Sequence, residues 1–304
     1  MKILKRVLFV IVFGVVAYYL GWGVLAYGYL PHYLAQKEEI SIETDEDSSD
    51  IRIMSCNVRY FNQYDHGKKS WFYRADLMMD SIEKAAPSII GFQEVTSLQY
   101  DYLVETMPEF DSVITYRDDA ANAEGCPVFY HTDKYTLVDK GSFWLSETPE
   151  IMSKDWGSEC YRICSYVILK EKVTEKEFVV FNTHLDHVSD EARINGIQVV
   201  LDKIKEFGNL PAVLMGDLNA VESSETYKSA TATFFDAKYE TENTMTSCTF
   251  QNWGEELDGN CVDYVMLSPN SFEVHFYKVI TDTYDGVYIS DHFPLLVELE
   301  LTSS

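Results

Sequence analysis

The sequence predicts an α/β domain that follows an N-terminal membrane helix. Short apolar runs of strand length alternate with segments of helical periodicity from residue 51 onward. The chain has 304 residues, 46% of them hydrophobic, which is enough to bury one large core, and it contains no internal repeat. We therefore expect one α/β domain over residues 51–301, since such domains commonly reach about 250 residues.

The N-terminal segment has the length and apolarity of a membrane span. No residue from Val7 to Pro31 is charged, and a helix of this length crosses a bilayer core with some tilt. The basic residues before it are Lys2, Lys5 and Arg6. The positive-inside rule then predicts a cytoplasmic N-terminus at 1–6, an anchor at 7–30 and a body on the exported side. Loose small-x-small patterns leave signal cleavage open.

The charge distribution limits the partners of the body. The net charge is −25, and the first 37 residues hold four basic residues and no acid, so the remainder carries 20 basic against 49 acidic residues. Residues 31–50 are interpreted as an acidic, solvated tether because they lack periodicity. An acidic body repels polyanions, so tight nonspecific nucleic-acid binding is not expected, although a local groove or bound cations would still admit a phosphate.

The cysteines do not have the spacing of a metal site. They are Cys56, Cys126, Cys160, Cys164, Cys248 and Cys261. In an exported domain they could pair as disulfides with fifteen connectivities. Buried, unpaired thiols are the simpler interpretation.

The expected elements follow along the chain. Strands are predicted near residues 51–56, 89–92, 112–116, 126–131, 135–140, 161–169, 178–181, 212–215, 261–267 and 295–301. Helices are predicted at 74–86, 98–107 and after Ser189, whose hydroxyl can cap the helix that follows.

Many of the apolar strands end in, or next to, polar residues. The run before Gly216 is the clearest case, because it delivers Asp217 and Asn219 together at a turn. The full set is Asn57, Glu94, His184, Asp217, Asn219, Asp263, Asp291 and His292. Each alone is an ordinary turn former or structural group. A packed sheet, however, brings distant strand ends together.

In this order and with these neighbours, the residues resemble the endonuclease/exonuclease/phosphatase superfamily over roughly residues 50–301. The strongest motifs are Gln93-Glu94, Asn182-Thr183-His184-Leu185, Gly216-Asp217-Leu218-Asn219 and Ser290-Asp291-His292-Phe293-Pro294. The segment Phe143 to Pro149, Phe-Trp-Leu-Ser-Glu-Thr-Pro, is similar to a mainly bacterial subgroup. The resemblance implies a four-layered α/β sandwich, in which two mixed β-sheets pack face to face with helices outside.

The resemblance also implies a metal site. Glu94 matches the main Mg²⁺ ligand, with Asn57 and Asp291 as supporting ligands and Mn²⁺ as an alternative ion. Carboxylate and amide oxygens are hard ligands, and water and a substrate phosphate complete an octahedron around Mg²⁺.

The remaining matched residues have catalytic roles in the family. Asp217 matches the group that orients or deprotonates the attacking water, and Asn219 and His184 match the groups that hold a nonbridging phosphate oxygen. His292 matches the final histidine, with Asp263 fixing its tautomer. The implied reaction is in-line attack of water on phosphorus without a covalent intermediate. A catalytic role for either histidine would make the rate titrate near neutral pH.

Three further residues are candidates for substrate binding. Arg162 lies in a predicted strand and would either contact phosphate or pair with a local acid, since a buried unpaired arginine is costly. Asp186 and His187 follow His184 directly and would add a second metal site, tune that histidine or form a structural hydrogen bond.

The leading hypothesis is a membrane-anchored, Mg²⁺-dependent phosphoesterase. Its substrate would be a lipid headgroup, a small phosphoester or a single-stranded nucleic acid. No basic loop for gripping duplex DNA is evident, which argues against DNA repair. The alternatives are an exported nuclease of the same superfamily and a noncatalytic binding or scaffold protein that keeps the fold. A scaffold would be expected to have lost a metal ligand or the water-activating acid.

Overall fold

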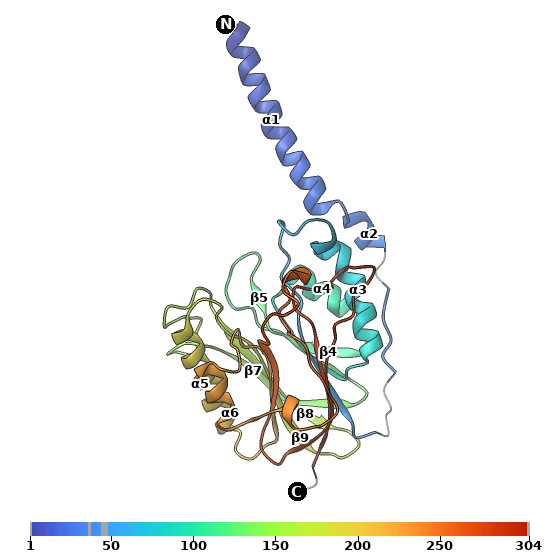
Figure 1. The fold of residues 1–304 in the computed structure, drawn as a ribbon, viewed down its shortest axis with the longest axis vertical. Coiled ribbons are helices and arrows are strands. Elements are labelled where there is room, and N and C mark those ends of the chain that lie inside the picture. The colour runs from blue at the N-terminus through green and yellow to red at the C-terminus, as the bar shows by residue number, and fades with distance from the viewer. Residues whose placement is uncertain (1, 36–37, 44–47, 303–304) are drawn as a thin grey trace.

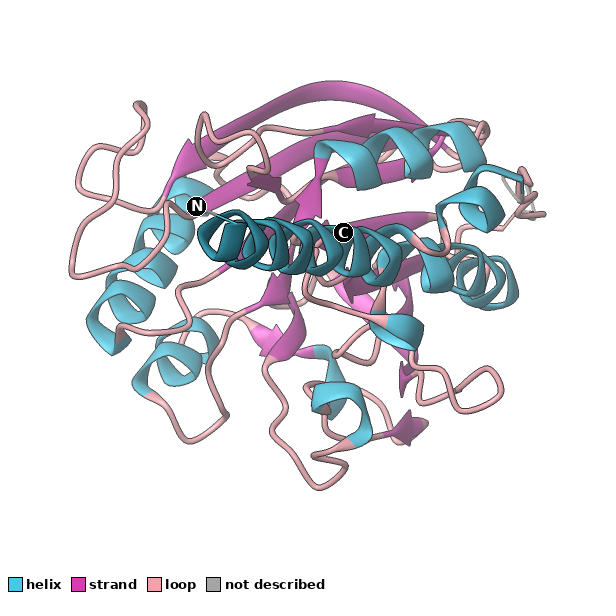
Figure 2. Ribbon diagram, turned by 90° about the horizontal axis from the view of Figure 1, so that it is seen from above, coloured by secondary structure: helices cyan, strands magenta, loops and turns pink. Residues whose placement is uncertain are grey.

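The body of the protein is a layered α/β sandwich. The computed structural model describes residues 2–35, 38–43 and 48–302. Two packed, mixed β-sheets lie between helices: α5 and α6 cover one side, and α3 and α4 cover the other (Figure 1). Seen from above, the strands again lie among helices, and α1 runs across the body (Figure 2). The main helices are α1 (Lys2–Tyr27), α2 (Leu30–Ala35), α3 (Trp71–Ala85), α4 (Ser97–Thr106), α5 (Asp190–Glu206) and α6 (Glu225–Thr231). The predicted α/β sandwich is confirmed.

The strands form two large sheets and one small one. The first large sheet has the order β12-β14-β15-β1-β2-β6-β4, the second has the order β11-β13-β10-β9-β8-β7, and β3 pairs with β5. Their bounds are β1 (Ile51–Asn57), β2 (Ile89–Gln93), β3 (Val95–Thr96), β4 (Phe110–Val113), β5 (Glu124–Gly125), β6 (Val128–His131), β7 (Tyr135–Trp144), β8 (Ile163–Glu171), β9 (Glu177–His184), β10 (Ala212–Asp217), β11 (Phe235–Asp236), β12 (Thr244–Met245), β13 (Asp263–Leu267), β14 (Phe272–Val279) and β15 (Leu295–Leu301).

Strand β1 shows why the central strands are apolar throughout. Ile51 and Ile53 belong to the core between the two sheets, whereas Met54 and Cys56 belong to the core beneath α3 and α4. A third core lies beneath α5. A strand covered on both faces needs apolar side chains at successive positions. Its sequence is therefore a continuous apolar run, without the alternation of apolar and polar residues found in a half-exposed strand.

The strand register brings the polar strand ends together. β1 runs parallel to β2, which sets Asn57 opposite Gln93. In the other sheet β10 runs parallel to β9 and antiparallel to β13, which sets Asp217 between His184 and Asp263. Because the carboxyl ends of parallel strands meet at one edge of a sheet, the predicted site residues of both sheets lie at the same end of the sandwich.

Some elements differ from the sequence prediction. Helix α3 starts at Trp71, three residues before the predicted start, and both β14 and α6 were not predicted. β14 pairs with β15 with a register shift between Val274 and Phe276, and such an irregularity obscures strand periodicity. All six cysteines are unpaired, so the disulfide alternative is wrong in this structure.

The N-terminal segment consists of two helices. α1 leaves the body as one extended helix, and α2 lies against α3 (Figure 1). Within the part of the chain that the structure describes, no helix is both long and apolar enough to span a membrane. The membrane anchor at 7–30 therefore stays a prediction from the sequence.

Part of the predicted acidic tether packs on the body. Tyr33, Ile40 and Ile42 are buried, and the backbone N–H of Ile40 donates to the carbonyl oxygen of Thr106. The tether interpretation of 31–50 is thus wrong for these three positions, because their apolar side chains pack into the core beneath α3 and α4. The tether acids Asp45, Glu46 and Asp47 lie outside the described residues.

Candidate active site

Every predicted site residue lies in or directly behind one cavity of about 470 Å³. Eight of them line it: Glu94, Arg162, His184, His187, Asp217, Asn219, Asp291 and His292. The other three residues lie behind the lining residues and contact them. Asn57 donates to Glu94, Asp263 pairs with His292, and Asp186 lies 3.7 Å from Arg162. The fold therefore assembles the complete set that the sequence predicted.

Asp217 is the centre of the polar cluster. It is 1% exposed, its Oδ1 accepts a hydrogen bond from the backbone N–H of Asn219, and its Oδ2 lies 3.5 Å from His184 Nε2 and 3.7 Å from His292 Nε2. Burial and the nearby charge of Asp263 raise the pKa of Asp217 to about 7. A carboxylate with this pKa is suited to accept a proton near neutral pH.

The two histidines lie in opposite electrostatic environments. His292 Nδ1 lies 2.8 Å from Asp263 Oδ2. Burial opposes protonation of His292, but the carboxylates of Asp263 and Asp217 outweigh it and raise its pKa to about 10. Burial and the positive charge of Arg162 hold the pKa of His184 well below its ordinary value. His292 is therefore a cationic donor, and His184 is a neutral ring.

Asn219 holds the neutral histidine. Its Nδ2 lies 2.9 Å from His184 Nε2 and 3.0 Å from the carbonyl oxygen of Leu185. The backbone of Asn219 has a φ of +48°, and that of Glu94 has a φ of +63°. Non-glycine residues in this left-handed region cost about 1–3 kcal/mol and are concentrated at functional sites.

The predicted metal ligands form the acidic side of the cavity. Asn57 Nδ2 donates to Glu94 Oε1 and to Asp217 Oδ2, each over 3.1 Å. Burial raises the pKa of Asp291, with further repulsion from Glu94. Hydrogen bonds from the backbone of Tyr60 and the charge of Arg59 overcome burial and lower the pKa of Glu94. Two close carboxylates of this kind fit a hard divalent cation, which would relieve their repulsion.

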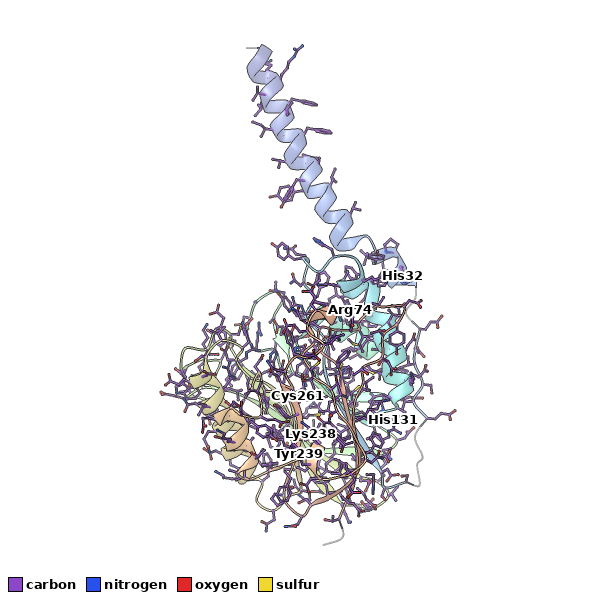
Figure 3. The ribbon with its side chains drawn as sticks, in the orientation of Figure 1. His32, Arg74, His131, Lys238, Tyr239 and Cys261 are labelled. Atoms are coloured by element: carbon purple, nitrogen blue, oxygen red, sulfur yellow. The ribbon has the colours of Figure 1, made fainter. Side chains whose placement is uncertain are left out.

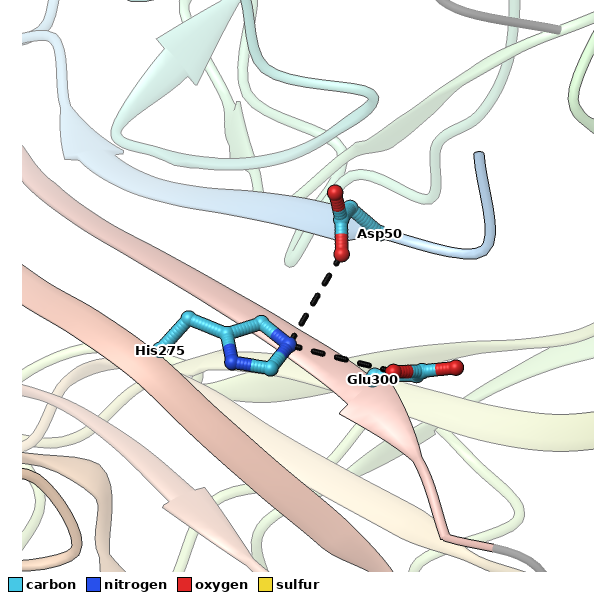
Figure 4. A group of neighbouring side chains, drawn as sticks. All are labelled: Asp50, His275 and Glu300. Atoms are coloured by element: carbon cyan, nitrogen blue, oxygen red, sulfur yellow. Dashed lines mark ion pairs between the residues drawn. The ribbon is translucent and has the colours of Figure 1, made fainter. Parts of the chain in front are cut away.

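A second acid and histidine group lies away from the site. His275 Nε2 lies 3.7 Å from Asp50 Oδ1 and 3.9 Å from Glu300 Oε2, and Figure 4 marks these two ion pairs with dashed lines. This trio and the group Asp217, Asp263 and His292 are the sets among the described residues whose ligand atoms lie within 4.8 Å of one another. Asp50 precedes β1 and Glu300 is near the end of β15, so the trio lies at the opposite end of the sheet from Asn57.

Arg74 fixes the segments next to the metal ligands. Its guanidinium is fully buried and donates to four backbone carbonyl oxygens, those of Val58, Arg59, Lys69 and Ile289. Val58 follows Asn57, and Ile289 lies two residues before Asp291. Figure 3 places Arg74 at the end of the body from which α1 leaves. Arg74 was not predicted from the sequence, because an arginine in a helix gives no signal of where its side chain points.

The candidates beyond His184 have clear structural partners. The carboxylate of Asp186 accepts backbone hydrogen bonds from Glu159, Cys160, Val188 and Ser189, and these lower its pKa to about 2 against the effect of burial. This supports the structural alternative for Asp186. His187 Nδ1 lies 3.0 Å from Arg162 Nη2, and Arg162 is 5% exposed.

Three charged residues of the cavity lining were not predicted, namely Arg59, Arg117 and Glu124. Arg59 pairs with Asp65 and lies 3.5 Å from Asp291, and Arg117 forms a two-point ion pair of 2.7 Å with Glu124. They come from loops and the short strand β5, where no periodicity marks them.

Known proteins are similar to this chain in sequence and in fold. Residues 54–292 match the Endonuclease/Exonuclease/phosphatase family, so the chain belongs to that family. Its members are metal-dependent phosphoester hydrolases, which defines the class of this enzyme.

Similar proteins cover the whole domain. The structure of an endonuclease/exonuclease/phosphatase from Bacteroides vulgatus is 33% identical with a TM-score of 0.79, and the match covers 84% of this chain and 100% of the other. A mannosyl-6-phosphatase from Bacteroides thetaiotaomicron VPI-5482 is 33% identical with a TM-score of 0.75, covering 83% and 100%. An uncharacterized protein of Acanthamoeba polyphaga mimivirus is 26% identical over 274 residues, covering 82% and 100%.

Proposed function

We propose that this protein is a membrane-anchored, Mg²⁺-dependent hydrolase that cleaves a phosphodiester or phosphomonoester on the exported side of the cell membrane. The observation that carries the chemistry is the position of Asp217, a buried carboxylate between a cationic His292 and the acidic side of the cavity. A scaffold protein would have no need to keep this arrangement intact.

The residues of the chain divide the work of hydrolysis. Glu94, Asn57 and Asp291 would hold Mg²⁺, which when bound polarises a phosphate oxygen. Asp217 Oδ2 takes the proton of the attacking water, since its pKa of about 7 matches that task. His292, kept protonated by Asp263, donates to a nonbridging oxygen as negative charge develops.

Support for the substrate comes from charge and from the comparisons. The acidic body disfavours long polyanions. One protein similar to this chain is named as a mannosyl-6-phosphatase, which favours a small phosphoester. An anchor would raise the effective concentration of substrates near the bilayer, which also favours a lipid headgroup.

The experiment uses the full-length chain in mild detergent with Mg²⁺. Three substrates are compared: mannose 6-phosphate, sphingomyelin in mixed micelles and a single-stranded oligonucleotide, each with Asp217→Asn as the blank. We expect cleavage of the sugar phosphate or the lipid headgroup that the blank lacks. Cleavage of the oligonucleotide alone would favour an exported nuclease, and no cleavage of any would favour the noncatalytic alternative.

The anchor and its orientation are tested separately. The full-length chain should sediment with membranes and resist carbonate extraction, whereas a chain lacking residues 2–27 should not. Protease should digest the body when it is added to cells whose cell membrane is closed but whose outer envelope has been permeabilised. A body that is protected there, or a full-length chain that is released by carbonate, would contradict the proposal.

A further inference from the structure

The segment 143–149 supports two arginines of the cavity. The indole N–H of Trp144 donates to the carbonyl oxygen of Arg117, and the backbone N–H of Leu145 donates to the carbonyl oxygen of Arg162, both over 2.8 Å. Within the segment, the backbone N–H of Trp144 donates a hydrogen bond to the carbonyl oxygen of Pro149. It therefore fixes the backbone of two arginines that come from different parts of the sequence.

These arginines make the cavity wall beside His184. Both line the main cavity, and both line a smaller recess next to it together with Glu94, Glu124 and His184. Their positive charge is strong enough at His184 to help lower its pKa. The cavity thus has an acidic side suited to a metal ion and a cationic side suited to an anion.

Arg117 and Arg162 differ in how far they are neutralised. Arg117 is matched by the two oxygens of Glu124. Arg162 is not matched in this way, since its nearest carboxylate, Asp186, lies 3.7 Å away and is occupied by backbone donors.

The buried Nε of Arg162 has no hydrogen-bond partner and faces Asp186 Oδ2 at 3.7 Å, while Nη2 lies 3.0 Å from His187 Nδ1. A buried donor of this kind costs free energy until an acceptor arrives. The remaining terminal nitrogen, Nη1, has no hydrogen-bond partner among the described residues, and because Arg162 lines the cavity, Nη1 is the donor that an oxygen of the substrate would meet.

A count of oxygens separates two classes of substrate. A terminal phosphate has three nonbridging oxygens and carries nearly two negative charges at neutral pH, whereas a diester has two such oxygens and one charge. One oxygen would lie toward Glu94, Asn57 and Asp291, which would hold the cation, and a second would lie toward the groups around His292. Arg162 is a third donor, and a diester would face it with an ester group that accepts poorly.

We propose that Arg162, held in place by segment 143–149, binds the third nonbridging oxygen of a terminal phosphate, so that the site selects phosphomonoesters over phosphodiesters. This inference rests on the proposed phosphoesterase function and narrows its substrate class.

The test compares p-nitrophenyl phosphate with bis(p-nitrophenyl) phosphate in the presence of Mg²⁺. Wild type should prefer the monoester. Arg162→Gln should lower kcat/KM for the monoester by roughly tenfold to a hundredfold and for the diester by less than about threefold, since a hydrogen bond to a charged group is lost in one case only. Arg162→Lys should lie between. The control is Arg52→Gln, at the far end of β1. Equal losses on both substrates, or a wild type that prefers the diester, would overturn the inference.

A binding measurement separates this inference from the proposed function. Titration calorimetry with inorganic phosphate and Mg²⁺ needs no turnover, and thermal unfolding shows whether each variant is folded. If wild type hydrolyses neither substrate, the proposed function fails. Weaker phosphate binding in Arg162→Gln and Arg162→Lys would still support the cationic subsite, whereas unchanged affinity in a folded variant would refute it.

Discussion

Gln93 donates a hydrogen bond from Nε2 to Asn182 Oδ1 over 2.7 Å, and this bond joins the two β-sheets directly beneath the site. Asn182 in turn donates to the carbonyl oxygens of Phe92 and Pro127. Both side chains are fully buried. Each is followed within two residues by a cavity residue, Glu94 and His184, so the bond sets the spacing between the metal side of one sheet and the histidine of the other.

Asn182→Ala should destabilise the fold by about 3 kcal/mol, because it removes three buried hydrogen bonds that join β9 to Gln93, Phe92 and Pro127. Chemical denaturation measures the change. Asn195→Ala is the matched control, since its amide bonds only to a carbonyl in the exposed part of α5, and it should stay within about 0.5 kcal/mol of wild type. Equal effects of the two substitutions would contradict the role of Asn182.

Gly216→Ala should prevent normal packing of the two parallel strands that present Asp217 and His184. Its φ is +134°, and a Cβ at this position would lie 1.9 Å from the carbonyl oxygen of Thr183. We expect a loss of at least about 3 kcal/mol in the free energy of unfolding. Gly208→Ala has a positive φ but no atom within 4 Å, so it should cost only about 1 kcal/mol. A mild effect at Gly216 would show that the strands can separate.

Glu94→Gln should abolish stabilisation by Mg²⁺. In wild type, saturation at about a hundred times Kd should add about 2.7 kcal/mol, seen as a rise in Tm. Asp50→Asn alters the acid and histidine group in Figure 4 and should leave that rise unchanged. A rise that survives Glu94→Gln and disappears in Asp50→Asn would move the metal site to the other end of the sheet.

The rate should depend on pH through Asp217. Its carboxylate acts as a base only when ionised, so kcat/KM should increase with pH and reach half of its plateau at about pH 7, or at a lower pH where a bound cation lowers this pKa. Asp217→Asn should reduce kcat/KM by ~100- to 10,000-fold. Rates measured from pH 5 to 9 check this, and a wild-type rate that falls steadily over that range would exclude Asp217 as the base.

A titration of the rate through Asp217 differs from the expectation from the sequence, in which a catalytic histidine titrates near neutral pH. A histidine is the usual source of a titration near neutral pH. Here the pKa of His292 is raised to about 10 by Asp263 and Asp217, and burial holds that of His184 far below its ordinary value. The residue types did not reveal this, because pKa values depend on the distances between groups that only meet in the folded chain.

The sequence alone determined the fold class, the family and the eleven candidate residues. Strands buried on both faces need continuous apolar runs, which can be recognised in the sequence. Hydrolysis of a phosphate ester needs acids, amides and histidines, and these follow directly where the runs end. The motif from Gly216 to Asn219 is the clearest, since a glycine is required there by a close backbone contact that no other residue allows.

The tertiary structure alone decided which groups are charged and which side chains support the site. Arg74 contacts segments far from it in the sequence, such as Ile289, and Arg117 pairs with Glu124 across a loop. Neither neighbourhood carries a periodic signal. The packing of Tyr33 and Ile40 on the body, and the partnerless Nε of Arg162, likewise arise from burial. Burial is a property of the assembled layers, because it depends on which surfaces meet and not on the order of residues along the chain.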